Sequence, residues 1–119
     1  MTVRSLVAAF AIASMPGLGF AQSSTGQALS GAGTTSCGQY IEHSDDSHLS
    51  NLYVTWAQGF LSGLNIANNV IAKQEFVLLP DGASIKAYLD KYCRENPLEE
   101  PITGTMLLFK ELREKQKAP

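Results

Sequence analysis

The sequence of 119 residues is poor in the side chains from which most chemical centres are built. It has two histidines and two cysteines, and no CxxC pair of the kind found in redox and zinc sites. Nine Lys and Arg stand against eleven Asp and Glu, and no basic cluster suggests a nucleic-acid partner. These absences direct the search for function toward surfaces and away from cofactor chemistry.

The first residues have the organisation of a secretory signal peptide. Arg4 precedes an apolar run over 6–13, a Pro/Gly break follows, and small residues favour cleavage after Ala21. An uncleaved membrane anchor is the alternative, but the run is shorter than the roughly 20 apolar residues of a membrane span. We predict a signal peptide over 1–21, and a mature chain over 22–119 that is periplasmic and has no membrane contact after cleavage.

Export determines what is expected of Cys37 and Cys93. In an oxidising compartment, two cysteines of a small domain are expected to form a disulfide. Closing a loop of about 57 residues is worth about 4 kcal/mol in the chain-entropy model, which is comparable to the net stability of such a domain. Two free thiols at a redox or metal site are the alternative, which the missing CxxC spacing disfavours.

The spacing of apolar residues divides the mature chain into three parts. Residues 22–36 are rich in Ser, Gly and Thr, which predicts a flexible arm. Helical periodicity then runs over 37–113 and predicts one all-α domain, a small four-helix bundle stapled by the disulfide, with a polar tail over 114–119. The expected helices are about 37–43, 48 to 70 or 72, 83–95, and one that begins at or just after Pro101. Ser36, and Asp81 or Ser84, are placed to cap two of them.

The second predicted helix is expected to supply most of the core. One arc of its helical wheel carries Leu49, Leu52, Tyr53, Trp56, Phe60, Gly63, Leu64 and Ala67. Gly59 and Gly63 cost roughly 1 kcal/mol each against alanine, which favours close packing of another helix on them, with a hinge as the alternative. The inner stripe of the last helix is predicted to be Ile102, Met106, Phe109 and Leu112. The connector "EFVLL" over 75–79 is expected to be a buried loop or a short strand.

The same helix has no charged side chain between His48 and Lys73. Charge depletion is typical of the core of a protein interface, whereas solvent-facing helices normally carry charges. We therefore predict a partner-binding surface on the face opposite the expected core, formed by Val54, Gln58, Leu61, Ser62 and Asn65. A plain polar face, or one covered by the N-terminal arm, is the alternative.

The stretch "EHSDDSH" concentrates titratable groups: Glu42, His43, Asp45, Asp46 and His48. Its two histidines are separated by four residues across a predicted turn, and no further Cys or His is free to complete a metal site. Neighbouring Ser, His and Asp rarely form a catalytic triad, because triads join distant segments. We predict no catalytic residue, no metal site and no cofactor here. Asp45, Asp46 and Ser47 are each suited to cap the long helix, and the five titratable residues have, as a second possibility, a role in sensing pH.

Four motifs in order, "SCGQYIE", "WAQGFLSGLN", "LPDGASIKAYLDKYCRENPLEE" and "MLLFKELREK", give the chain its resemblance to known families. It resembles the HdeA/HdeB-type acid-stress chaperones, and it is also similar to the Tai-type immunity proteins that block amidase toxins delivered by type VI secretion. Either resemblance implies a non-enzymatic protein that binds other proteins, either unfolded clients or one cognate enzyme. A homodimer is compatible with both. Of the residues, only the pair Cys37 and Cys93 carries over.

The preferred interpretation is the acid-stress chaperone. As pH falls, eleven carboxylates lose charge while Lys, Arg and His stay positive, so repulsion and lost caps are expected to loosen the fold. Clients unfolded by acid would then bind the segments that become exposed. An inhibitor of a periplasmic enzyme is the alternative, and a small enzyme or metal protein is the third.

Overall fold

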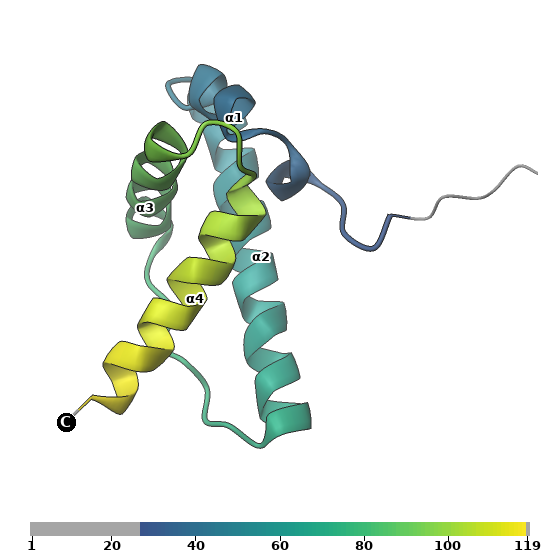
Figure 1. The fold of residues 1–119 in the computed structure, drawn as a ribbon, viewed down its shortest axis with the longest axis vertical. Coiled ribbons are helices and arrows are strands. Elements are labelled where there is room, and N and C mark those ends of the chain that lie inside the picture. The colour runs from purple at the N-terminus through teal and green to yellow at the C-terminus, as the bar shows by residue number, and fades with distance from the viewer. Residues whose placement is uncertain (1–26, 119) are drawn as a thin grey trace, which may run out of the picture.

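A computed structural model describes residues 27–118, so the predicted signal peptide and the first residues of the arm lie outside the described part. Over this range the chain forms a short 3₁₀ turn, η1 (Ala32–Thr34), and four α-helices, with no strand. The helices are α1 (Cys37–His43), α2 (Ser47–Ala72), α3 (Gly82–Glu95) and α4 (Pro101–Lys117). The predicted all-α, four-helix architecture is confirmed (Figure 1).

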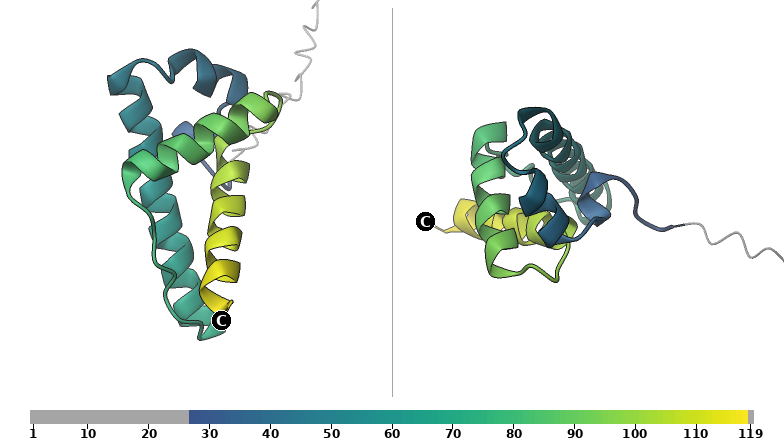
Figure 2. Two further views of the ribbon diagram at one scale, coloured as in Figure 1. Left: turned by 90° about the vertical axis from the view of Figure 1, so that its left-hand side faces the viewer. Right: turned by 90° about the horizontal axis from the view of Figure 1, so that it is seen from above.

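The helices are arranged so that the connector between α2 and α3 and the end of α4 meet at one end of the molecule. α2 and α4 run in the same direction, and their C-terminal ends lie at the lower end of Figure 1. α3 crosses them in the side view of Figure 2 and contacts α1, α2 and α4. α1 and the α3–α4 loop lie at the opposite end. The connector between α2 and α3 therefore shares its end of the molecule with the last turns of α4.

The helix boundaries follow from local signals in the sequence. Ser36, Asp46 and Asp81 are the N-caps of α1, α2 and α3, and each side chain accepts a hydrogen bond from a first-turn backbone N–H, at 3.1, 2.8 and 2.7 Å. Pro101 occupies the first turn of α4, where its missing N–H has no helical partner to lose. These residues explain why the predicted starts agree with the observed ones within one residue.

The disulfide between Cys37 and Cys93 is confirmed, and it ties the start of α1 to the last turns of α3. Around it lies a core of buried side chains from all four helices, which includes Tyr40, Tyr53, Leu61, Ile85, Leu89, Leu108 and Phe109. α4 approaches α3 closely at Gly104, where an added Cβ would lie 2.6 Å from the ring of Tyr92. On α4, Ile102 and Phe109 are buried as predicted, whereas Met106 is 52% exposed.

The prediction of which face of α2 is buried in the core was wrong. Its buried residues are Ser50, Tyr53, Val54, Ala57, Leu61 and Asn65, and of the predicted arc only Tyr53 is buried. Leu52 is 61% exposed, and an added Cβ at Gly59 or Gly63 would meet no atom within 4 Å. α2 is apolar on two sides, and the bundle buries the side that carries Tyr53, Val54 and Leu61. A methyl group at Gly82, the first residue of α3, would lie 3.1 Å from Val54.

The connector after α2 is extended and is held by two side-chain amides instead of a neighbouring strand. Asn65 exchanges two buried hydrogen bonds with Val77, both of 2.9 Å: its Nδ2 donates to the carbonyl, and its Oδ1 accepts from the N–H. Gln116 donates to the carbonyl of Phe76 at 3.0 Å and accepts from the N–H of Leu78 at 3.1 Å. This contact explains why α4 continues past residue 113, where the sequence ended the domain. Only Val77 of the apolar segment 76–78 is buried.

The part of the predicted flexible arm that the structure describes is docked on α2 around Trp56. The indole N–H of Trp56 donates to the carbonyl of Ser30 at 3.1 Å, and an added Cβ at Gly33 would overlap the indole ring. Gly31 has φ of 103°, a left-handed conformation that other residues rarely adopt. The arm over 30–36 is therefore a packed segment that covers one side of Trp56.

Candidate functional site

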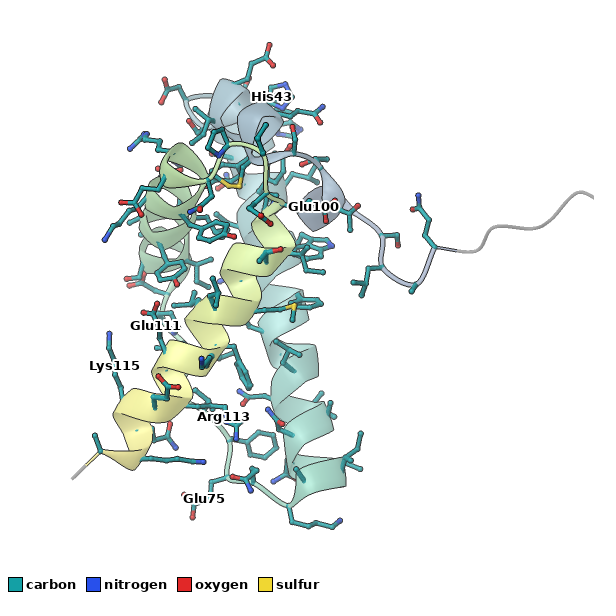
Figure 3. The ribbon with its side chains drawn as sticks, viewed as in Figure 1. His43, Glu75, Glu100, Glu111, Arg113 and Lys115 are labelled. Carbon is teal, nitrogen blue, oxygen red and sulfur yellow. A yellow bond between two sulfur atoms is a disulfide. The ribbon has the colours of Figure 1, made fainter. Side chains whose placement is uncertain are left out.

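The junction between α1 and α2 is built around a helix cap. The Asp46 carboxylate accepts hydrogen bonds from the backbone N–H groups of Leu49 and His48, and these bonds lower the pKa of Asp46 below its ordinary value. Glu42, Asp45 and His48 are exposed. His43 is half-buried and lies at the upper end of the molecule in Figure 3. Within residues 27–118, no three His, Cys, Asp or Glu side chains lie close enough to hold a metal ion. The junction therefore has the geometry of a cap, and the predicted capping role of Asp46 is confirmed.

Two further carboxylates hold the helices together. Asp90 on α3 accepts a hydrogen bond from the Tyr40 hydroxyl at 2.7 Å and pairs with Lys86 at 2.8 Å. Burial, and then the hydrogen bond to Asp90, raise the pKa of Tyr40. Glu111 on α4 accepts from the Tyr88 hydroxyl at 2.8 Å, and burial, followed by this bond, raises the pKa of Tyr88 to about 12.

The outer face of α2 carries an exposed apolar surface, which we name the outer strip. It is formed by the exposed residues Leu52, Gly59, Gly63 and Ile66 and by the half-buried rings of Trp56 and Phe60. The rings of Trp56 and Phe60 stack with their centroids 5.1 Å apart, and Ile66 is 59% exposed. The strip lies wholly within the part of α2 that has no charged residue. It is therefore a surface that water solvates poorly and that no charge protects from association.

Two grooves lie along the part of the outer strip from Leu52 to Gly63. One shallow groove of about 520 Å³ has Gly59 and Gly63 in its floor, and its walls include Trp56, Phe60 and Leu29 of the N-terminal arm. A second groove, of about 290 Å³, lies at the start of α2 and includes Leu52. Thr55 lines both, so the two grooves are neighbours on α2. The glycines leave space in which another backbone or an apolar side chain can lie.

Three of the five residues of the predicted partner surface are buried in this fold. Val54, Leu61 and Asn65 are buried in the bundle, while Gln58 and Ser62 are exposed beside them. The missing charge on α2 did indicate an exposed apolar face, but the face lies on the other side of the helix. The signal that could have located it was the glycine pair, which the sequence assigned to close packing.

No protein-family model, curated protein or solved structure matches this chain. Among residues 27–118, every helix is too short or too polar to cross a lipid bilayer. The disulfide is compatible with export to an oxidising compartment.

Proposed function

We propose that this is a non-enzymatic periplasmic protein that acts by binding other proteins, and that the outer strip is its binding surface. The observation that carries the proposal is a strip of two exposed aliphatic and two half-buried aromatic side chains around two open glycines, on a stretch of helix without charges. Exposed apolar surface with depleted charge is typical of protein interfaces. The two stacked aromatic rings resemble the anchors that dominate binding energy in such interfaces.

The preferred form of this function is an acid-stress chaperone. Asp46 and Asp81 cap α2 and α3, and their backbone hydrogen bonds lower the pKa of both carboxyl groups. A carboxyl group whose pKa is lower in the folded state stabilises the fold above its ordinary pKa of about 3.9, and this contribution is lost as pH falls through the lower folded value. Acid below about pH 4 therefore removes the caps and loosens both helices. Client proteins that unfold in the same pH range would bind the outer strip.

The test compares protection of unrelated proteins from aggregation at about pH 3, below the ordinary pKa of Asp. The strip variants Leu52→Lys and Ile66→Lys should lose protection because they place charge on the apolar surface. Leu98→Lys is the matched control, since Leu98 is a fully exposed leucine in the α3–α4 loop, away from the strip. Equal protection by all three variants would show that the outer strip is not the surface that binds clients. If the unmodified protein stays folded at this pH and protects nothing, the chaperone function is excluded.

A second candidate is an inhibitor that binds one folded periplasmic enzyme at neutral pH. The observation in its favour is that the strip is already exposed in the folded protein, so no acid step is needed to reveal it. This candidate predicts capture of a single enzyme from periplasmic extract at pH 7, and loss of that capture in Ile66→Lys. A chaperone would instead capture many proteins, and only after acidification.

A further inference from the structure

The charges of this protein are segregated along its length. We define the basic tip as residues 70–78 and 113–117, which comprise the end of α2, the start of the connector and the end of α4. The tip holds four basic residues, Lys73, Arg113, Lys115 and Lys117, and two acidic ones, Glu75 and Glu114. The other described residues carry four basic and nine acidic side chains. The tip therefore has a net charge of +2, whereas the rest of the described residues have a net charge of −5.

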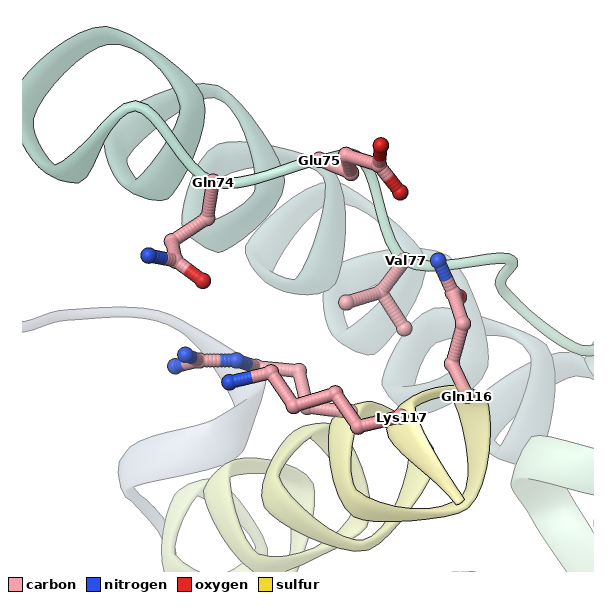
Figure 4. A pocket seen from close by; sticks show the side chains of 6 residues that line it. Gln74, Glu75, Val77, Gln116 and Lys117 are labelled. Atoms are coloured by element: carbon pink, nitrogen blue, oxygen red, sulfur yellow. The ribbon is translucent and has the colours of Figure 1, made fainter. Parts of the chain in front are cut away.

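The structure brings these segments together at one end of the molecule. Gln116 bonds the backbone of Phe76 and Leu78, and a hollow of about 320 Å³ between the connector and α4 is lined by Gln74, Arg113 and Lys117, among others. In Figure 4, Lys117 and Gln74 lie on opposite sides of this hollow. Figure 3 shows Glu75 at the lower end, and His43 and Glu100 at the upper end.

The basic tip also carries the most exposed apolar side chains of α2 and the connector. Ile71 is 81% exposed and Leu78 is 82% exposed, and Val70 and Phe76 are more than half exposed. Ion pairs among the described residues join Lys86 to Asp90 and Lys110 to Glu114, so the four cations of the tip have no acidic partner within 4.0 Å. Lys115 and Lys117 also offset the dipole of α4. The dipole does not account for Lys73 or for the apolar residues.

We propose that the basic tip binds the surface of lipid bilayers that contain anionic phospholipids. Lys and Arg near such a surface are attracted to the negatively charged headgroups, and exposed apolar side chains can enter the interface between headgroups and acyl chains. A lipid surface is favoured over an acidic protein because Ile71 and Leu78 are among the most exposed side chains and do not line a groove that would receive a partner's side chains. This surface differs from the outer strip and departs from the absence of membrane contact that the sequence predicted.

The test is co-sedimentation of the mature protein with vesicles. Binding is expected to vesicles of mixed phosphatidylglycerol and phosphatidylcholine, to weaken as salt is raised, and to be absent with phosphatidylcholine alone. The double variant Lys115→Gln/Lys117→Gln should bind the anionic vesicles about tenfold or more weakly. Ile71→Ser/Leu78→Ser should also weaken binding, because it removes the apolar contact.

Matched controls lie outside the tip. Lys91→Gln removes an exposed cation of α3, and Leu98→Ser removes an exposed leucine of the α3–α4 loop, so both should bind anionic vesicles as the unmodified protein does. Circular dichroism and urea unfolding establish that each variant is folded. Failure of the unmodified protein to bind anionic vesicles at low salt would overturn the proposal. The proposal would also be overturned, in favour of an acidic protein partner, by two results together: polyglutamate abolishes the binding to vesicles, and Ile71→Ser/Leu78→Ser binds as the unmodified protein does.

Discussion

Substitution of Asn65 by alanine tests whether α2 is oriented as the structure shows. The side chain is 8% exposed, and it satisfies both backbone groups of the buried Val77 through two hydrogen bonds of 2.9 Å. Alanine removes both bonds and leaves a buried N–H and a buried carbonyl without partners. If Asn65 lay on a partner-binding surface, the same change would weaken association and hardly affect the free energy of unfolding.

The magnitude follows from the cost of unpaired polar groups. Each buried donor or acceptor left without a partner costs about 1–3 kcal/mol. The two groups of Val77 regain part of this cost if water reaches them, so we expect Asn65→Ala to lower the free energy of unfolding by about 2–4 kcal/mol. Gln116→Ala is a matched control, because Gln116 makes the same paired bonds to the same segment from an exposed position. Water can replace the hydrogen bonds of Gln116, so Gln116→Ala should lower the free energy of unfolding by less than about 1 kcal/mol.

The assay is urea unfolding at neutral pH, followed by circular dichroism. Both variants should unfold with a slope like that of the unmodified protein, so that the midpoints report stability. A cost below about 1 kcal/mol for Asn65→Ala, or equal costs for the two variants, would contradict the placement of Asn65 in the core. A sharply changed slope for Asn65→Ala would show that the connector has detached as a separate unit.

Three further predictions concern other parts of the fold. Gly59→Ala and Gly63→Ala should each raise the free energy of unfolding by up to about 1 kcal/mol in urea titrations, because the new methyl group meets no atom and alanine favours a helix; a loss would mean that the strip is covered. Reduction of the disulfide should lower the free energy of unfolding by about 4 kcal/mol, measured with and without reductant, and an unchanged midpoint would contradict this. Asp46→Asn/Asp81→Asn retains neutral caps, so its free energy of unfolding should fall less between pH 7 and pH 3 than that of the unmodified protein; equal falls would place the acid sensitivity elsewhere.

Features encoded by neighbouring residues could be predicted from the sequence. The caps at Ser36, Asp46 and Asp81 and the proline at the start of α4 each act within one helical turn, so the starts of the four helices were predicted to within one residue. The disulfide could also be predicted, because a chain with two cysteines offers one intramolecular pairing and the expected export favours its oxidation. These signals depend on local geometry and on the compartment, and neither requires knowledge of how the helices pack.

The orientation of α2 could not be obtained in this way. Two of its sides are apolar, and periodicity alone favours the side with the larger side chains, Trp56 and Phe60. The choice is made by residues distant in sequence: Gly82 lets the start of α3 approach Val54, and Val77 supplies two backbone groups that Asn65 satisfies. A buried asparagine between apolar neighbours looks like a surface residue until its partner is known. The displaced aromatic side then becomes the outer strip.

The two proposed surfaces are arranged so that both can be used at once. α2 is 26 residues long, which corresponds to about 39 Å, with the outer strip along its side and the basic tip at its C-terminal end. A molecule attached to a bilayer by Ile71 and the neighbouring lysines would hold α2 with its N-terminal end directed away from the lipid. The acidic remainder of the protein favours the same orientation, because anionic headgroups repel it. Leu52 would then lie farther from the lipid than Ile66, and the strip would stay accessible to protein partners.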